Sequence, residues 1–175
     1  PEHPWFLCYA ESDDGIHWRK PELGLFEFNG SKKNNILLTP EAAAAVHGDP
    51  AHTSVFKDAN PDCPADARYK CVIVGKPHGL YLLKSADGIR IRVATEKPVI
   101  TQGAFDSENL AFWDPERKLY VEYQRQCRDG FRDILTATSP DFVTWPEPEF
   151  LEYGDAPIDV EAGVAGAHAV YTDVW

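Results

Sequence analysis

A short motif of Ser, Asp and a turn residue occurs three times in the chain and decides its fold class. The copies read Ser12-Asp13-Asp14-Gly15-Ile16-His17-Trp18, Ser85-Ala86-Asp87-Gly88-Ile89-Arg90-Ile91 and Ser139-Pro140-Asp141-Phe142-Val143-Thr144-Trp145. Each copy follows an apolar, strand-like segment, and its Ser and Asp side chains can hydrogen-bond the backbone of a tight turn. Gly permits the positive φ of such a turn, and the large apolar residue returns the chain to the core. The motif therefore predicts three β-hairpins.

Alternating apolar and polar residues predict four short strands around each of the last two motifs. The strands are residues 54–57, 68–74, 79–84 and 89–94, then residues 109–113, 118–124, 133–138 and a short strand near Trp145. Four antiparallel strands have the size of one β-propeller blade. The blade-like units are residues 5–28 (two outer strands), 53–100 and 105–152, and residues 153–175 resemble the start of another. We therefore expect an all-β chain in which residues 1–175 form a single β-propeller domain, or a fragment of one, with about two and a half blades.

Other features of the sequence fit this interpretation. Only Pro40–Val46 has helix-forming composition, and so short a run is more typical of a surface turn. The four cysteines form no C-x-x-C pair, so we expect buried thiols, with Cys63–Cys71 as the pair that could form a single bridge. The chain contains no Met, and we interpret it as a processed product or a piece of a longer protein.

The composition argues against two classes of partner. Asp and Glu total 28 against 17 Lys and Arg, which gives a formal net charge of −11. A field of that sign repels nucleic acid and anionic lipid headgroups. No apolar run is long enough to span a membrane, and no signal peptide is recognisable. We therefore expect neither nucleic acid nor membrane as a partner.

Several segments resemble a known family. The motifs Phe28-Asn29-Gly30-Ser31-Lys32-x-Asn34-Asn35 and Gly103-Ala104-Phe105-Asp106-Ser107-x-Asn109-Leu110-Ala111-Phe112-Trp113-Asp114, with the three Ser/Asp motifs, resemble bacterial proteins that are similar to the N-terminal domain of glycoside hydrolase family 32. The resemblance covers nearly all of residues 5–157. It implies a five-bladed β-propeller related to families 32, 43 and 68, whose members cleave fructosyl, arabinosyl or xylosyl linkages without a cofactor. The implied substrate is an oligo- or polysaccharide.

The resemblance also indicates where a site would lie. In the related propellers, the starts of the innermost strands line a funnel in which two carboxyl groups flank the scissile bond. Asp106, at the start of the second unit's innermost strand, is our first catalytic candidate, because the related enzymes place a sugar-binding Asp there. Glu108 would share its face if the strand were already regular, and is the second. The alternatives are a capping Asp and a solvated loop carboxylate.

Four residues are candidates for substrate binding: His52, Asn109, Arg125 and Arg128. His52, preceded by Asp49, has the corresponding position in the first unit, and a surface histidine is the alternative. The two arginines lie in a charged turn with Asp129, Arg132 and Asp133, where the alternative is a solvated hairpin. Glu122 and Gln124 alternate with apolar neighbours, so we expect them on an exposed blade face.

Some features of the related glycosidases are missing. The chain has no Trp-Asn-Asp-Pro-type nucleophile motif and no Glu-Cys acid motif, and its Asp58-to-Asp62 run lacks the Gly and Glu of a calcium loop, so we expect no metal. The leading hypothesis is a glycoside hydrolase that uses paired carboxylates. The alternatives are a non-catalytic sugar-binding or protein-interaction propeller and a structural fragment. These residues specify no compartment, although a secreted or periplasmic location would suit an enzyme that degrades polysaccharides.

Overall fold

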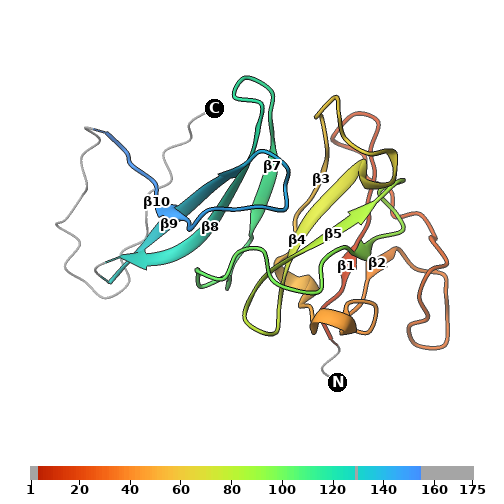
Figure 1. Cartoon of the computed structure of the whole chain (residues 1–175). Helices are drawn as coiled ribbons and strands as arrows, with labels where there is room; N and C mark the ends of the chain where they lie inside the picture. Colours follow the sequence, from red (N-terminus) through yellow and green to blue (C-terminus); the bar gives the residue numbers. More distant parts are fainter. Residues whose placement is uncertain (1–3, 129, 155–175) are drawn as a thin grey trace.

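The computed structural model describes residues 4–128 and 130–154, and its fold is all-β, as predicted (Figure 1). Three antiparallel sheets follow one another along the chain. The first pairs β1 (Leu7–Cys8) with β2 (Ile36–Leu38); the second runs β3 (Val55–Lys57), β4 (Tyr69–Gly75), β5 (Gly79–Ser85), β6 (Arg92–Val93); the third runs β7 (Leu110–Asp114), β8 (Leu119–Arg128), β9 (Phe131–Ser139), β10 (Glu149–Phe150). The helical segments of the described chain are short 3-10 turns at Ala44–Val46, Pro50–His52 and Ala65–Ala67.

The three Ser/Asp motifs form the predicted hairpin turns with the same hydrogen bonds. In the third copy, the amide of Phe142 donates to Ser139 Oγ at 3.0 Å, and the amides of Val143 and Thr144 donate to Asp141 Oδ1 at 2.8 and 2.7 Å. Corresponding bonds occur at Ser12 with Asp14 and at Ser85 with Asp87. Gly15 and Gly88 have φ of 74° and 77°, and Phe142 adopts the same conformation at 67°.

The three units also share a strand register. Five residues before each motif serine, the third strand of the unit pairs with the segment that returns after the turn: Leu7 with Leu38, Leu80 with Ile100, and Ile134 with Leu151. Residues 7–38 therefore have the structure of the outer part of an earlier sheet. The predicted start of a further unit lies, apart from residues 153 and 154, outside the described residues.

The second sheet lies between the other two and is apolar on both faces. One face of β4 and β5 packs with Leu38 and Val46, while Val72 and Leu80 on the other face pack with residues of the third sheet and the preceding loop, among them Phe105. Burial on both sides explains why β4 and β5 are almost continuously hydrophobic instead of alternating.

A buried ion pair joins the second and third sheets. Lys70 on β4 contacts Asp58, whose Oδ2 also accepts a 2.7 Å hydrogen bond from the Tyr120 hydroxyl on β8. Asn60 donates to that hydroxyl at 3.1 Å, and Lys70 Nζ also lies 3.1 Å from Cys63 Sγ. Burial alone would raise the pKa of Asp58, but hydrogen bonds from Lys70, the Asn60 amide and Tyr120 lower it below its usual value. The pair is therefore ionised.

The expectation of cysteine thiols is confirmed, but the expectation that they are buried is wrong for Cys8 and Cys127. All four thiols are free, so Cys63 and Cys71 form no bridge, and Cys8 and Cys127 are exposed. Cys71 is the fully buried thiol of the four, which raises its pKa to about 12. Pro40–Val46 is a turn that ends in a single 3-10 turn, as expected.

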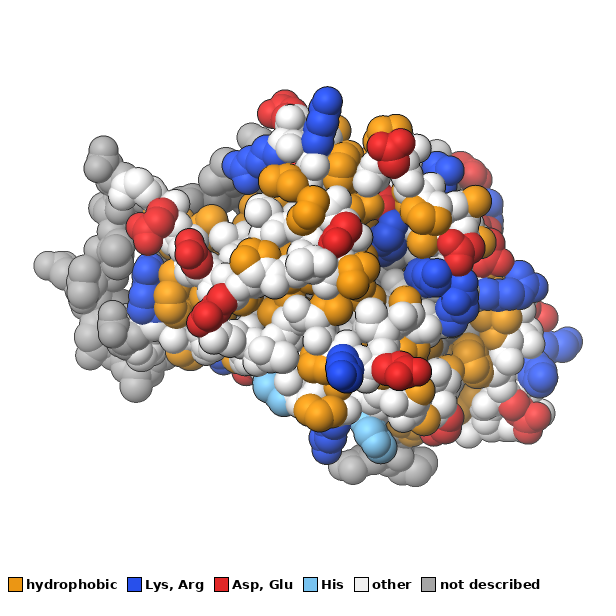
Figure 2. Space-filling view, viewed as in Figure 1, with side chains coloured by type: hydrophobic (Ala, Val, Ile, Leu, Met, Phe, Trp, Pro, Cys, Tyr) orange, Lys and Arg blue, Asp and Glu red, His pale blue; other side chains and the backbone are white. Residues whose placement is uncertain are grey.

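Charged side chains of both signs are interspersed over the face of the molecule shown in Figure 2.

Candidate functional site

The starts of the innermost strands of the last two sheets lie side by side. Thr53, just before β3, and Asn109, just before β7, form a parallel β-bridge. Asn109 is fully buried, and its Nδ2 donates to the carbonyl oxygens of His52 at 3.3 Å and Ser107 at 3.1 Å. The Asn109 side chain therefore fixes one strand start against the other through the backbone of His52.

His52 ends a 3-10 turn beside this bridge. The turn begins at Asp49, whose Oδ1 accepts a 2.9 Å hydrogen bond from the Ala51 amide. Asp49 Oδ2 lies 3.5 Å from His52 Nδ1, and both side chains are partly exposed. The imidazole thus has a carboxylate beside it and remains accessible to a ligand.

Residues 101–109, which we call the site loop, carry Asp106 to the same place. Asp106 Oδ2 lies 3.0 Å from Arg125 Nη2, with the Asp106 side chain 51% exposed and the Arg125 side chain 18% exposed. The backbone of Arg125 also holds the loop, because the amide of Ala104 donates to the Arg125 carbonyl at 3.4 Å. The Asp106 carboxylate is therefore exposed to solvent, while the Arg125 side chain that holds it is largely buried.

Close packing determines the path of the site loop. Gly103 has φ +148°, and a Cβ there would overlap Gln124 Oε1. Gln124 Nε2 donates to the carbonyl of Gln102 at 2.8 Å. Phe105 has φ 52°, an uncommon conformation for a large residue, and its buried ring lies 5.0 Å from the His78 ring. The strained backbone next to Asp106 is thus held by burial of the Phe105 ring.

Buried polar atoms without a hydrogen-bond partner gather behind this loop. Within the described residues, such side-chain atoms are Asn109 Oδ1, both carboxyl oxygens of Glu122, Gln124 Oε1 and Arg125 Nε. All belong to β8 or to the residue that precedes β7. Most buried polar groups in proteins are hydrogen-bonded, so this group of unpartnered atoms is unusual. It indicates that the polar side chains behind the loop do more than stabilise the fold.

Glu122 and Gln124 are buried, contrary to the expectation of an exposed blade face. They lie on the face of β8 that packs toward the second sheet, and both are almost completely inaccessible. Burial raises the pKa of the Glu122 carboxyl to about 8. Glu122 is therefore a neutral acid at pH 7, and a protonated carboxyl is the form that a general acid needs.

Of the remaining candidates, Glu108 lies on the site loop and Arg128 lies apart from it. Residues 106–108 precede β7, so the strand alternation that would align Glu108 with Asp106 does not apply, and Glu108 is exposed on the loop. Arg128 lies at the end of the β8–β9 hairpin, where its Nη2 is 2.7 Å from Asp133 Oδ2 and its guanidinium is 4.7 Å from the centre of the Phe150 ring. This agrees with the alternative of a charged hairpin. Asp129 lies outside the described residues.

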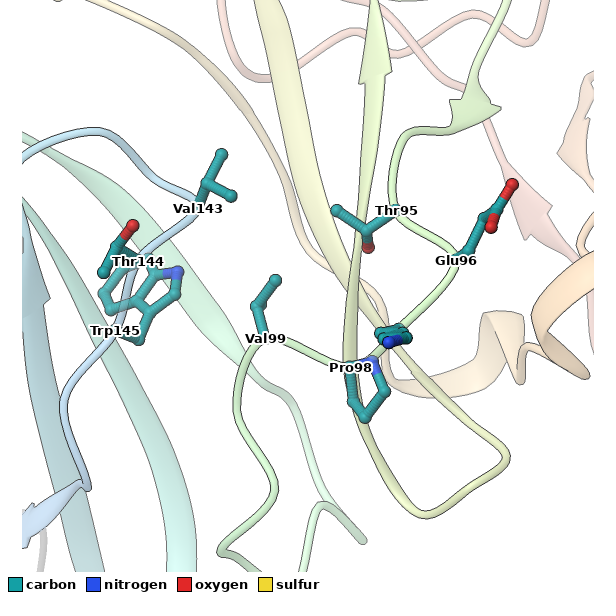
Figure 3. A pocket seen from close by; sticks show the side chains of 8 residues that line it. Thr95, Glu96, Pro98, Val99, Val143, Thr144 and Trp145 are labelled. Atoms are coloured by element: carbon teal, nitrogen blue, oxygen red, sulfur yellow. The ribbon is translucent and has the colours of Figure 1, made fainter.

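An open groove of about 600 Å³ lies elsewhere, between the outer parts of the last two sheets (Figure 3). Residues 95–99 form one wall, and Val143, Thr144 and Trp145 of the third motif form the other. The Trp145 indole is already used by the fold, because Nε1 donates to the Phe142 carbonyl at 3.0 Å. None of the groove residues belongs to the cluster around Asp106.

The described residues contain no group of three or more His, Cys, Asp or Glu side chains arranged to bind a metal ion. Among the same residues, no helix has the length and apolar character needed to cross a membrane. Comparisons with protein-family models, curated proteins and solved structures gave no match.

Sequence reasoning missed the residues that support the site from behind. Gln124 and Glu122 were recognised as a polar face, but the face was assigned to solvent. A usable signal was present: residue 122 pairs with Ala111 and Ala137, and small neighbours on both sides favour a packed rather than a solvated position. His78 and Gly103 gave no comparable signal, because their roles depend on contacts between distant segments.

Proposed function

We propose that the chain is part of a carbohydrate-active β-propeller in which Asp106 is the ionised carboxylate of a glycoside hydrolase site. The propeller is supported by three repeated units whose sheets succeed one another and by the parallel contact between innermost strand starts at Thr53 and Asn109. In a propeller, such starts surround the central axis. The site proposed here therefore lies at the mouth of an axial funnel.

The observation that carries the proposal is the ion pair between Asp106 and Arg125 beside the His52–Asn109 junction. An ionised carboxylate can stabilise the positive charge that develops on a sugar ring, or attack it. The half-exposed side chain leaves Asp106 accessible, while the contact with Arg125 fixes its orientation. His52 and Asp49 supply further groups able to hydrogen-bond sugar hydroxyls.

A second candidate, a non-catalytic sugar-binding module, is supported by the burial of Glu122. This residue has the raised pKa of a general acid, yet its side chain is closed off from solvent by the fold. In the described residues, Asp106 thus has a binding geometry without an accessible acid partner of this kind. Under this alternative, Asp106 and Arg125 hold a sugar without cleaving it.

Calorimetric titration and product analysis with fructosyl, arabinosyl and xylosyl oligosaccharides test both functions. We expect wild-type chain to bind one of these classes and D106N to bind it at least tenfold more weakly, with E116Q, at an exposed position of the turn after β7, as the control. Released sugar that disappears in D106N supports hydrolysis, and binding without product supports the second candidate. Binding that is equal in wild type and D106N contradicts both.

A further inference from the structure

Three buried side chains with unpartnered oxygen atoms share one face at the base of the site loop: Asn109, Glu122 and Gln124. The β7–β8 register pairs Leu110 with Tyr123, so Asn109 faces Gln124 across the strands. Glu122 lies two residues further along β8 and therefore on the same face. Cross-strand neighbours lie about 5 Å apart and diagonal ones about 7 Å, within reach of side chains of this length.

The face formed by Asn109, Glu122 and Gln124 has more hydrogen-bond acceptors than donors. Asn109 Nδ2 and Gln124 Nε2 are already used in bonds to backbone carbonyls of residues 52, 107 and 102, which leaves both amide oxygens as unpartnered acceptors. A carboxylate at Glu122 would add two more acceptors and a charge. A protonated carboxyl supplies one O–H donor instead.

We propose that Glu122 is a positioning residue that, as a neutral acid, donates one hydrogen bond from its single carboxyl O–H to an unpartnered amide oxygen of this face, that of Gln124 or Asn109, and so holds the site loop in place. Asn109 and Gln124 are two of the side chains that anchor the loop, one at its end and one at Gln102. The inference concerns the proposed site but needs no sugar to be tested.

The surroundings of Glu122 favour the neutral form. Its strand neighbours are Ala111 and Ala137, and burial in this environment is the cause of its raised pKa, about 8. The other titratable or charged groups near this face have partners of their own. Asp58, Lys70 and Tyr120 form their own network, Asp106 pairs with Arg125, and His52 lies beside Asp49. His78 lies against Phe105, and its Nε2 is 3.3 Å from the Gly103 carbonyl of the site loop, a contact that E122Q retains.

Hydrogen exchange of peptides covering residues 101–109, corrected for the intrinsic effect of pH, tests this role. In wild type, we expect protection of the loop to fall about tenfold per pH unit once the pH exceeds the Glu122 pKa, because one proton is lost. E122Q keeps a donor and no charge, so its protection is expected to stay level from pH 6 to 9. E116Q, a Glu-to-Gln change at an exposed position of the turn between β7 and β8, is expected to follow wild type.

E122L removes the donor and is expected to leave the loop poorly protected at every pH. The proposal is wrong if wild-type protection is as level as that of E122Q, or if E122Q opens the loop as much as E122L. Should E122L not fold, the comparison of wild type with E122Q still decides. Sugar titration of wild type and E122Q at pH 7 separates the two proposals. If wild type binds none of the sugars, the proposed function is wrong, but the hydrogen-exchange result for the loop is unaffected.

Discussion

Removal of the Lys70 ammonium should destabilise the chain far more than removal of a surface lysine. K70M leaves the Asp58 carboxylate, which has no exposed surface, without its counter-ion. The Tyr120 hydroxyl and the Asn60 amide still donate to Asp58, but neither neutralises its charge. Breaking a buried ion pair on one side costs about 3–5 kcal/mol, and the good fit of a Met side chain among Tyr120 and Phe142 favours the lower end.

The assay is urea unfolding followed by tryptophan fluorescence. K84M is the matched control, because Lys84 lies on the neighbouring strand β5 and pairs with the exposed Asp66. Its loss should cost less than about 1 kcal/mol. The double variant K70M/D58N should recover part of the lost free energy of unfolding, since it removes the Asp58 charge that K70M leaves unpaired.

The pH dependence gives an independent check of the same reasoning. The folded-state pKa of Asp58 is lowered, so its pair with Lys70 adds stability above the unfolded pKa of about 3.9 and loses it as the pH falls toward the folded value. The gap between wild type and K70M should therefore narrow below about pH 4. A cost for K70M as small as that for K84M at pH 7 would refute the view that this network joins the two sheets.

Three further predictions concern the turn, the loop and the buried acid. S139A should cost about 1–2 kcal/mol in thermal unfolding, because the buried Ser139 hydroxyl holds the Phe142 amide, whereas S12A in the exposed first turn should cost less; equal costs would count against the argument. G103A should destabilise the chain by more than G30A, since Gly30 shares a positive φ but has open space around it, and the excess, about 1–3 kcal/mol, measures the clash with Gln124. Because the folded pKa of Glu122 is raised, wild type should lose about 1.4 kcal/mol of stability per pH unit relative to E122Q between pH 5 and 8, and level off above; parallel curves would show that the carboxyl is not held neutral.

Local rules were sufficient to predict the turns and the order of the strands. Ser139 and Asp141 bind amides within their own turn, so their roles depend only on nearby sequence, and each strand predicted between residues 54 and 152 has a counterpart in the structure. Of the two outer strands predicted within residues 5–28, only β1 lies there, because its partner β2 begins at Ile36. The fourth strand of each unit begins later than predicted, at Arg92 and Glu149, because the turn continues through the large apolar residue of the motif. Phe142 in the place of Gly was the one exception in the motif, and its buried ring offsets the backbone strain.

The support of the candidate site could not be predicted in this way, because it depends on which face of β8 meets the second sheet. Alternation shows that Glu122 and Gln124 share a face but does not show whether that face meets water or another sheet. In a stack of similar sheets, every inner sheet is covered on both faces, so a polar residue is no longer expected to be exposed. The polar residues of such a sheet then have two possible roles: joining sheets, as Asp58 and Lys70 do, or supporting a loop at the strand starts, as we infer for Glu122. Residues that join sheets have all their polar atoms hydrogen-bonded, as Asp58 and Lys70 do. Residues that support the loop are marked by buried acceptor atoms that lack a donor, as at Asn109 and Gln124.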